Sequence, residues 1–197
     1  MDIISLSLTL SEESSDVKDA LDEASKHDVV VLCATADEGN NQLFTTLARA
    51  ERAIAIAACD SYGKDLNFSQ TSDVHFKVQG KDVLVGSVPF VASTEAISGS
   101  SVSTAIAAGL ASLTLSCYRL AANKICSSGK KWRRAAVQGR FEKMSPRDRY
   151  IQPSLLVGLE EGRSRIPVLE TDCTKQKIER LIIASFKGTS LDEEANS

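Results

Sequence analysis

The sequence predicts an α/β domain of three layers, with a mainly parallel sheet and a buried central helix. Two short apolar runs, residues 28–34 and 53–58, are typical of strands that are covered on both faces. An alanine-rich segment at residues 101–121 has the length and composition of a long helix. Strand, helix, strand, loop, strand and long helix in this order are typical of a layered domain with a mainly parallel sheet.

The elements before the long helix follow from their apolar patterns. A strand is expected at residues 2–8, and a helix at residues 11–26, where Val17, Ala20, Leu21 and Ala24 form one apolar stripe. After the strand at residues 28–34, a loop is expected at residues 35–41 and weak helical character at residues 43–50. The strand at residues 53–58 leads into a turn at residues 60–64, and short strands are expected at residues 67–69, 74–78 and 82–85.

The sequence changes character after residue 122. A linker is expected at residues 127–129, a basic amphipathic helix with the single tryptophan at residues 131–143, and another helix at residues 174–186. The sequence therefore predicts a domain over residues 1–122 and a helical, charged C-terminal extension over residues 123–197, to which we assign no role.

Composition narrows the class of protein. The chain has 197 residues, of which 43% are hydrophobic and 25% are charged, as expected for one soluble globular domain. The net charge of −3 argues against a nucleic-acid partner, and we interpret the basic run at residues 130–149 as a solvated helix face. No uninterrupted apolar run approaches about 18 residues and no basic leader precedes the first strand, so we expect an intracellular protein without a membrane partner.

The cysteines are typical of buried, reduced thiols. The sequence has no C-x-x-C pair and no histidine close to a cysteine, which argues against a zinc site or a disulfide framework. The five positions are Cys33, Cys59, Cys117, Cys126 and Cys173.

The start of the long helix is the candidate site. Gly99, Ser100 and Ser101 lead directly into the helical segment. A hydroxyl at this point can cap the unpaired N–H groups of the helix, or it can be a nucleophile whose developing charge the helix dipole stabilises. The local pattern alone favours a cap.

Neighbouring segments change that preference, because they resemble the subtilisin-like serine peptidases (subtilases) in the same order. Residues 98–105 resemble S-G-T-S-M-A-T-P, which carries the nucleophile at the position of Ser101. Residues 31–40 resemble the strand and turn that end in A-A-G-N-E-G, where Asp37 replaces the oxyanion-hole asparagine. Residues 53–64 resemble A-I-A-V-G-A-V-D-S-x-G-K, residues 78–84 resemble A-P-G-x-D-I, and residues 3–8 resemble V-I-N-M-S-L-G.

The resemblance covers residues 2–120 and implies a serine endopeptidase that hydrolyses peptide bonds through an acyl-enzyme at Ser101. It implies an oxyanion hole at Asp37 and at the first N–H groups of the long helix. Ser100 is then a cap beside the nucleophile. A peptide or protein is the implied partner, and no metal or organic cofactor is implied. The residues implied to contact substrate are Ser5, Leu6, Ser7 and Gly99.

The sequence departs from the family pattern at several points. The motifs D-[ST]-G and H-G-T, which carry the family's catalytic Asp and His, are absent. Neither His27 nor His75 is followed by Gly-Thr, and we interpret both as structural or surface residues. An ionised Asp37 would repel the oxyanion, although a protonated one could donate to it. Ala105 also replaces the motif proline, and Ser7 and Leu8 replace glycines.

Two functions are consistent with these matches to the family pattern and departures from it. In the first, the chain is the carboxyl-terminal half of a subtilisin-like endopeptidase and is inactive as an isolated chain, because it lacks the Asp and His motifs. In the second, the chain is a non-catalytic pseudo-protease that serves as a binding or regulatory module. A nucleotide-binding domain is disfavoured because the sequence has neither G-x-G-x-x-G nor a Walker A motif.

Overall fold

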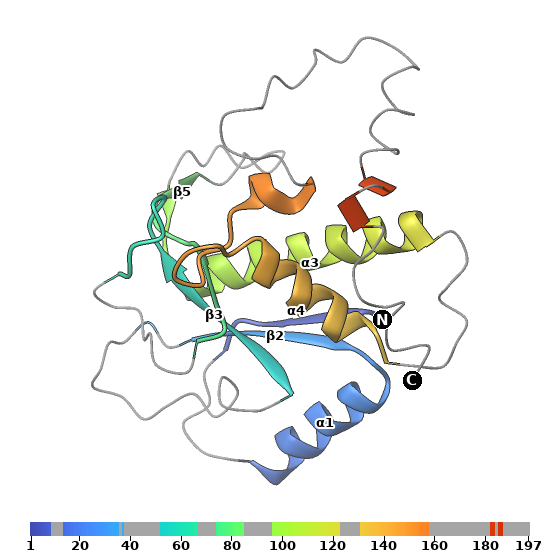
Figure 1. Ribbon diagram of the computed structural model, residues 1–197. Helices are drawn as coiled ribbons and strands as arrows, with labels where there is room; N and C mark the ends of the chain where they lie inside the picture. Colours follow the sequence, from blue (N-terminus) through green and yellow to red (C-terminus); the bar gives the residue numbers. More distant parts are fainter. Residues whose placement is uncertain are drawn as a thin grey trace, which may run out of the picture.

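The computed structural model describes residues 1–8, 14–35, 37, 52–66, 74–84, 96–122, 131–157, 182–183 and 185–186. Within these ranges, four parallel strands form one sheet in the order β1, β2, β3, β4. Figure 1 shows helices on both sides of this sheet, which confirms the predicted three-layer α/β architecture. The strands are β1 (Ile3–Leu6), β2 (Val30–Ala34), β3 (Ala53–Cys59) and β4 (Phe76–Gln79).

The helices occupy opposite faces of the sheet. Helix α1 (Ser15–Lys26) covers one face, while α3 (Ser100–Ala122) and α4 (Arg133–Lys143) cover the other. Strands β5 (Val83–Leu84) and β6 (Ala96–Ile97) form a separate antiparallel ladder before α3, and a 3₁₀ helix spans Pro153–Val157. The predicted elements at residues 43–50, 67–69 and 127–129, and most of the helix predicted at residues 174–186, lie outside the described residues.

Strands β2 and β3 are buried along their whole length, as their continuous apolar runs predict. Alternate residues point to opposite faces of a strand, so each strand contributes to two cores. The core under α3 and α4 contains Val30, Leu32, Ile54 and Ile56. The core under α1 contains Val31, Cys33, Ala53 and Ala55.

Helix α3 is the predicted central helix. Its buried face carries small residues such as Ala107 and Ala111, which let the helix lie close to the sheet. Residues Ser100–Ala121 are long and apolar enough to cross a membrane, with a mean hydropathy of 1.3, although serine and glycine interrupt the apolar run. A core helix that packs on a sheet has the same profile.

Helix α4 contributes to the same core as α3, although it lies beyond residue 122. Val137 and Phe141 are fully buried there, and the Phe76 ring packs edge-on against Phe141 with their centroids 5.4 Å apart. The segment after α4 then pairs with β4, since the Ile151 N–H donates to the Lys77 carbonyl oxygen at 2.9 Å. Residues on both sides of position 122 therefore share one core.

The interpretation of the basic run as a solvated helix face is wrong for part of α4. Arg140 is only 5% exposed; its guanidinium donates to the carbonyl oxygens of Leu156 and Ser185 and lies 4.1 Å from the centre of the Phe186 ring. Arg134 donates to the Ala53 carbonyl oxygen at 3.4 Å. These guanidinium groups therefore donate to backbone carbonyl oxygens instead of facing solvent.

The described cysteines are buried and free, as predicted. Burial raises the pKa of the Cys33 and Cys59 thiols to about 12, so neither is a thiolate at neutral pH. Burial also raises the pKa of Cys117. The two remaining cysteines, Cys126 and Cys173, lie outside the described residues.

The contact between β4 and the start of α3 leaves no space at Gly80. A Cβ at this position would lie 2.0 Å from Ser103 Oγ and 2.7 Å from the Gly99 carbonyl oxygen. We expect Gly80→Ala to lower the free energy of unfolding in urea by about 1–3 kcal/mol, because buried backbone must move. Gly109→Ala is the matched control: a Cβ there meets nothing within 4 Å, so the change should stabilise α3 by up to about 1 kcal/mol. Equal stability of the two variants would contradict this packing.

A second prediction concerns His75, whose Nδ1 accepts the Ala55 N–H at 3.0 Å. Burial lowers the pKa of His75, and the charges of Arg134 and Arg149 add to this shift. The unfolded chain, with an ordinary pKa of about 6.5, then binds more protons than the folded chain. The contribution of neutral His75 to the free energy of unfolding is therefore fully present above about pH 6.5, and it is lost as the pH falls below this value.

Urea unfolding from pH 7.5 to 5.5 measures this effect. His75→Asn, whose amide oxygen can accept the same N–H, should flatten the pH dependence. His27→Asn, at an exposed position, should retain it. The same slope in the wild type and in His75→Asn would rule out His75 as its source.

Candidate functional site

The start of α3 lies at the carboxyl edge of the sheet, where the sequence predicts the site. The Gly99 N–H donates to the Gly80 carbonyl oxygen at 2.8 Å, and the buried Ser103 Oγ donates to the Val78 carbonyl oxygen at 2.9 Å. These two bonds join the helix start to the end of β4. Ser101, one residue into the helix, is exposed.

Ser100 is buried and connects the helix start to β2. Its Oγ donates to the Thr35 carbonyl oxygen at 2.5 Å, directly after the last residue of β2. Through this bond the hydroxyl donates to a carbonyl oxygen outside the helix, and the expectation that Ser100 caps α3 stays a prediction. The contact fixes the residue beside Ser101 against the central sheet.

Asp37 also reaches the start of α3. Its Oδ2 accepts the Ser100 N–H at 2.8 Å, while its Oδ1 is buried without a hydrogen-bond partner among the described residues. A Cβ on Gly99 would lie 3.0 Å from Oδ2, and Gly99 has a φ of +143°, which favours glycine. The structure therefore brings Asp37, Gly99 and Ser101 together; their roles in binding and catalysis stay predictions.

The residues predicted to contact substrate on β1 and directly after it differ in orientation. Ser5 and Ser7 are exposed, whereas the side chain of Leu6 packs against the core under α1. The Ser7 Oγ donates to the Ser101 carbonyl oxygen at 3.4 Å, so the end of β1 lies beside the start of α3. Among the described strands β1 pairs only with β2, and no described strand pairs with its other edge.

The two histidines of the sequence lie away from this site. His27 precedes β2 and His75 precedes β4, and the amino ends of these parallel strands lie at the edge of the sheet opposite Ser101. His27 is exposed and contacts Glu23 at 3.0 Å, and the ring of His75 bonds to the backbone of β3. Their interpretation as structural or surface residues is confirmed, and neither is placed to accept a proton from Ser101.

Two contributors to the site were not singled out from the sequence. Thr35 acts through its backbone oxygen, for which a sequence carries no signal. Gly80 had a signal, because it is the glycine of the segment that resembles A-P-G-x-D-I. Among the described ranges, no group of three or more His, Cys, Asp or Glu side chains is arranged to hold a metal ion.

Several solved structures are similar to this chain over about three quarters of its length. The self-cleaved protease domain of PatA is 23% identical, with a TM-score of 0.61, over 78% of this chain and 61% of that domain. The prenylagaramide maturation protease PagA is 23% identical, with a TM-score of 0.60, over 75% of this chain and 53% of that one. The PatG macrocyclase in complex with peptide is 17% identical, with a TM-score of 0.59, over 75% of this chain and 44% of that one.

These likenesses show the fold, and the chain spans about half the length of the proteins it matches. No curated protein sequence matches the chain. The model of the Subtilase family matches residues 1–138, which include β1, Asp37, the start of α3 and half of α4. The chain belongs to the subtilase family.

Proposed function

We propose that this chain supplies the nucleophile and the substrate-binding edge of a subtilisin-like serine endopeptidase, and that the isolated chain does not hydrolyse peptide bonds. One observation carries the proposal. Ser101 is exposed at the start of α3, and both histidines lie at the opposite edge of the sheet. Without an adjacent base, a serine hydroxyl is a weak nucleophile.

The chemistry of a completed domain would follow from this placement. A base on polypeptide outside this sequence would accept the Ser101 proton as Oγ attacks the substrate carbonyl carbon. The Ser101 N–H, for which no acceptor lies among the described residues, would face the tetrahedral oxyanion. Collapse would release the amine product and leave an acyl-serine for water to hydrolyse. A peptide or protein substrate would pair its backbone with the open edge of β1.

A non-catalytic binding module is the second candidate, and Asp37 favours it. The family's asparagine donates to the oxyanion, and its loss in subtilisin costs a factor of roughly 10²–10³ in turnover. Asp37 instead accepts a hydrogen bond from Ser100. A carboxylate at this point disfavours oxyanion formation but leaves peptide pairing along β1 unaffected.

A fluorophosphonate probe tests the proposal, because it reacts with activated serine nucleophiles. We expect the folded 197-residue chain to show no labelling above that of Ser101→Ala, with subtilisin as the positive control. Peptide mass spectrometry identifies the modified residue. Labelling of Ser101 that disappears in Ser101→Ala would show that the isolated chain is active and would overturn the proposal.

The variant Asp37→Asn separates the two departures from the family pattern. Because the missing base limits formation of the nucleophile, restoring an amide at the oxyanion position should leave labelling at the background level. Labelling in Asp37→Asn would show that Asp37, and not the missing base, is the defect. In that event Asp37 alone would account for the inactivity of the pseudo-protease.

A further inference from the structure

We infer that Asp37 is a positioning residue: its carboxylate anchors the first turn of α3 and thereby fixes Ser101, instead of donating to an oxyanion. The inference rests on the proposed function only in taking Ser101 as the nucleophile position. The anchoring contact joins residues that are 63 positions apart, the Oδ2 of Asp37 and the N–H of Ser100. An ionised carboxylate has only acceptor atoms, so it can accept this N–H but cannot donate to a substrate.

The composition of α3 explains why an external anchor is needed. The first N–H groups of a helix lack partners within the helix, and a negative charge near them is stabilising. The first turn of α3 contains no acidic residue, and the residue before it, Gly99, has no side chain. Ser100 and Ser103 donate their hydroxyls to Thr35 and Val78, so they do not accept helix N–H groups through those bonds.

The other helix on this face is anchored in the same way. The Oδ2 of Asp28 accepts the N–H groups of Trp132 at 2.9 Å and Arg133 at 3.0 Å, at the start of α4. Asp28 precedes β2, and Asp37 follows it. Two carboxylates that flank one buried strand therefore bond to the starts of both helices.

The anchoring contact has an electrostatic consequence for the site. It places a carboxylate beside the first turn of α3, where the helix dipole would otherwise favour an anion on Ser101. The buried Oδ1 has no donor among the described residues to offset this charge. The same side chain thus fixes the position of Ser101 and opposes negative charge on it.

Amide hydrogen exchange in the full chain tests the anchor. We expect Asp37→Ala to speed exchange of the Ser100 N–H by about tenfold or more, because an unpaired amide exchanges faster. Asp37→Asn should restore most of the protection, since its amide oxygen can accept the same bond. The matched control, Asp28→Ala, should speed exchange at Trp132 and Arg133 and leave Ser100 unchanged. No change at Ser100 in Asp37→Ala would overturn the inference.

A thiol at position 101 provides a readout that loss of stability alone would not give. In a Ser101→Cys background, peptide mass spectrometry measures the pH at which iodoacetamide alkylates position 101 at half its maximal rate. Removing the carboxylate with Asp37→Asn should lower this pH by roughly one unit, whereas Asp28→Asn should not change it. An unchanged profile in Asp37→Asn would overturn the electrostatic role.

Neither measurement requires an active site. Fluorophosphonate labelling of Ser101 would therefore overturn the proposed inactivity without affecting this inference. Failure of the exchange experiment would remove the anchor, failure of the alkylation experiment would remove the electrostatic role, and either result would leave the proposed function standing.

Discussion

The arrangement of α3 and α4 depends on hydrogen bonds from helix N–H groups to carboxylates that flank β2. Asp28 lies before this strand and accepts from the start of α4, and Asp37 lies after it and accepts from the start of α3. Every residue of β2 is buried, so both carboxylates lie beside the ends of a strand that is fully enclosed. Charged acceptors at helix starts combine a hydrogen bond with a favourable dipole interaction. Ser101 takes its position from this framework.

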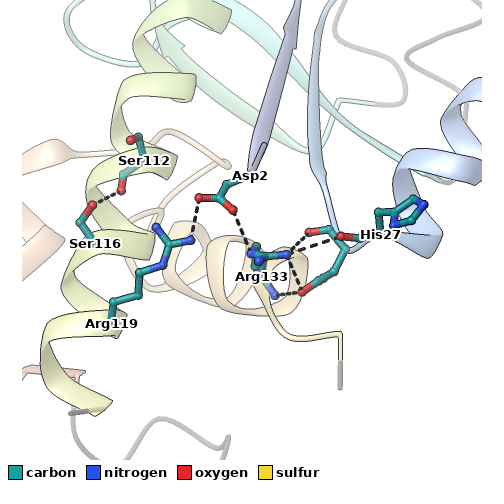
Figure 2. Close-up of polar contacts among 7 residues, drawn as sticks. Asp2, His27, Ser112, Ser116, Arg119 and Arg133 are labelled. Atoms are coloured by element: carbon teal, nitrogen blue, oxygen red, sulfur yellow. Dashed lines mark hydrogen bonds and ion pairs between the residues drawn. The ribbon is translucent and has the colours of Figure 1, made fainter. Parts of the chain in front are cut away.

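The far end of α3 is fixed by a second carboxylate. Figure 2 shows Asp2, just before β1, between Arg119 of α3 and Arg133 of α4; its oxygens lie 2.6 Å and 3.3 Å from their guanidinium nitrogens. The bond from Arg119 holds the pKa of Asp2 below its usual value. These groups are partly exposed, so each pair contributes about 0–1 kcal/mol. Their effect is to align β1 with α3, which brings Ser7 to Ser101 at the other end.

Sequence patterns predict the parts of this fold whose cause is local. The uninterrupted apolar runs of β2 and β3 indicate strands that are buried on both faces, and the small residues of α3 indicate a helix that packs closely. The burial of Arg140 could not be predicted in this way, because its acceptors are backbone oxygens of Leu156 and Ser185 that only the folded chain brings near. The bond between Asp37 and Ser100 is likewise a product of the fold: the motif indicates the position of Asp37 and not its partner.

The two departures from the subtilase pattern act at different stages of peptide hydrolysis. In the proposed function, a missing base would prevent activation of Ser101, whereas a carboxylate at residue 37 would oppose the charge that appears only after attack. Groups that act as one catalytic unit are not additive, so the proposal implies that the later defect would have no measurable effect while the earlier one persists. The contacts that hold Ser101 come from the backbone of β2 and β4 and from Asp37, and they serve the stability of α3 whether or not the serine reacts. The contacts that position Ser101 therefore belong to the fold, and in the proposed function activity would depend on a base that these contacts do not supply.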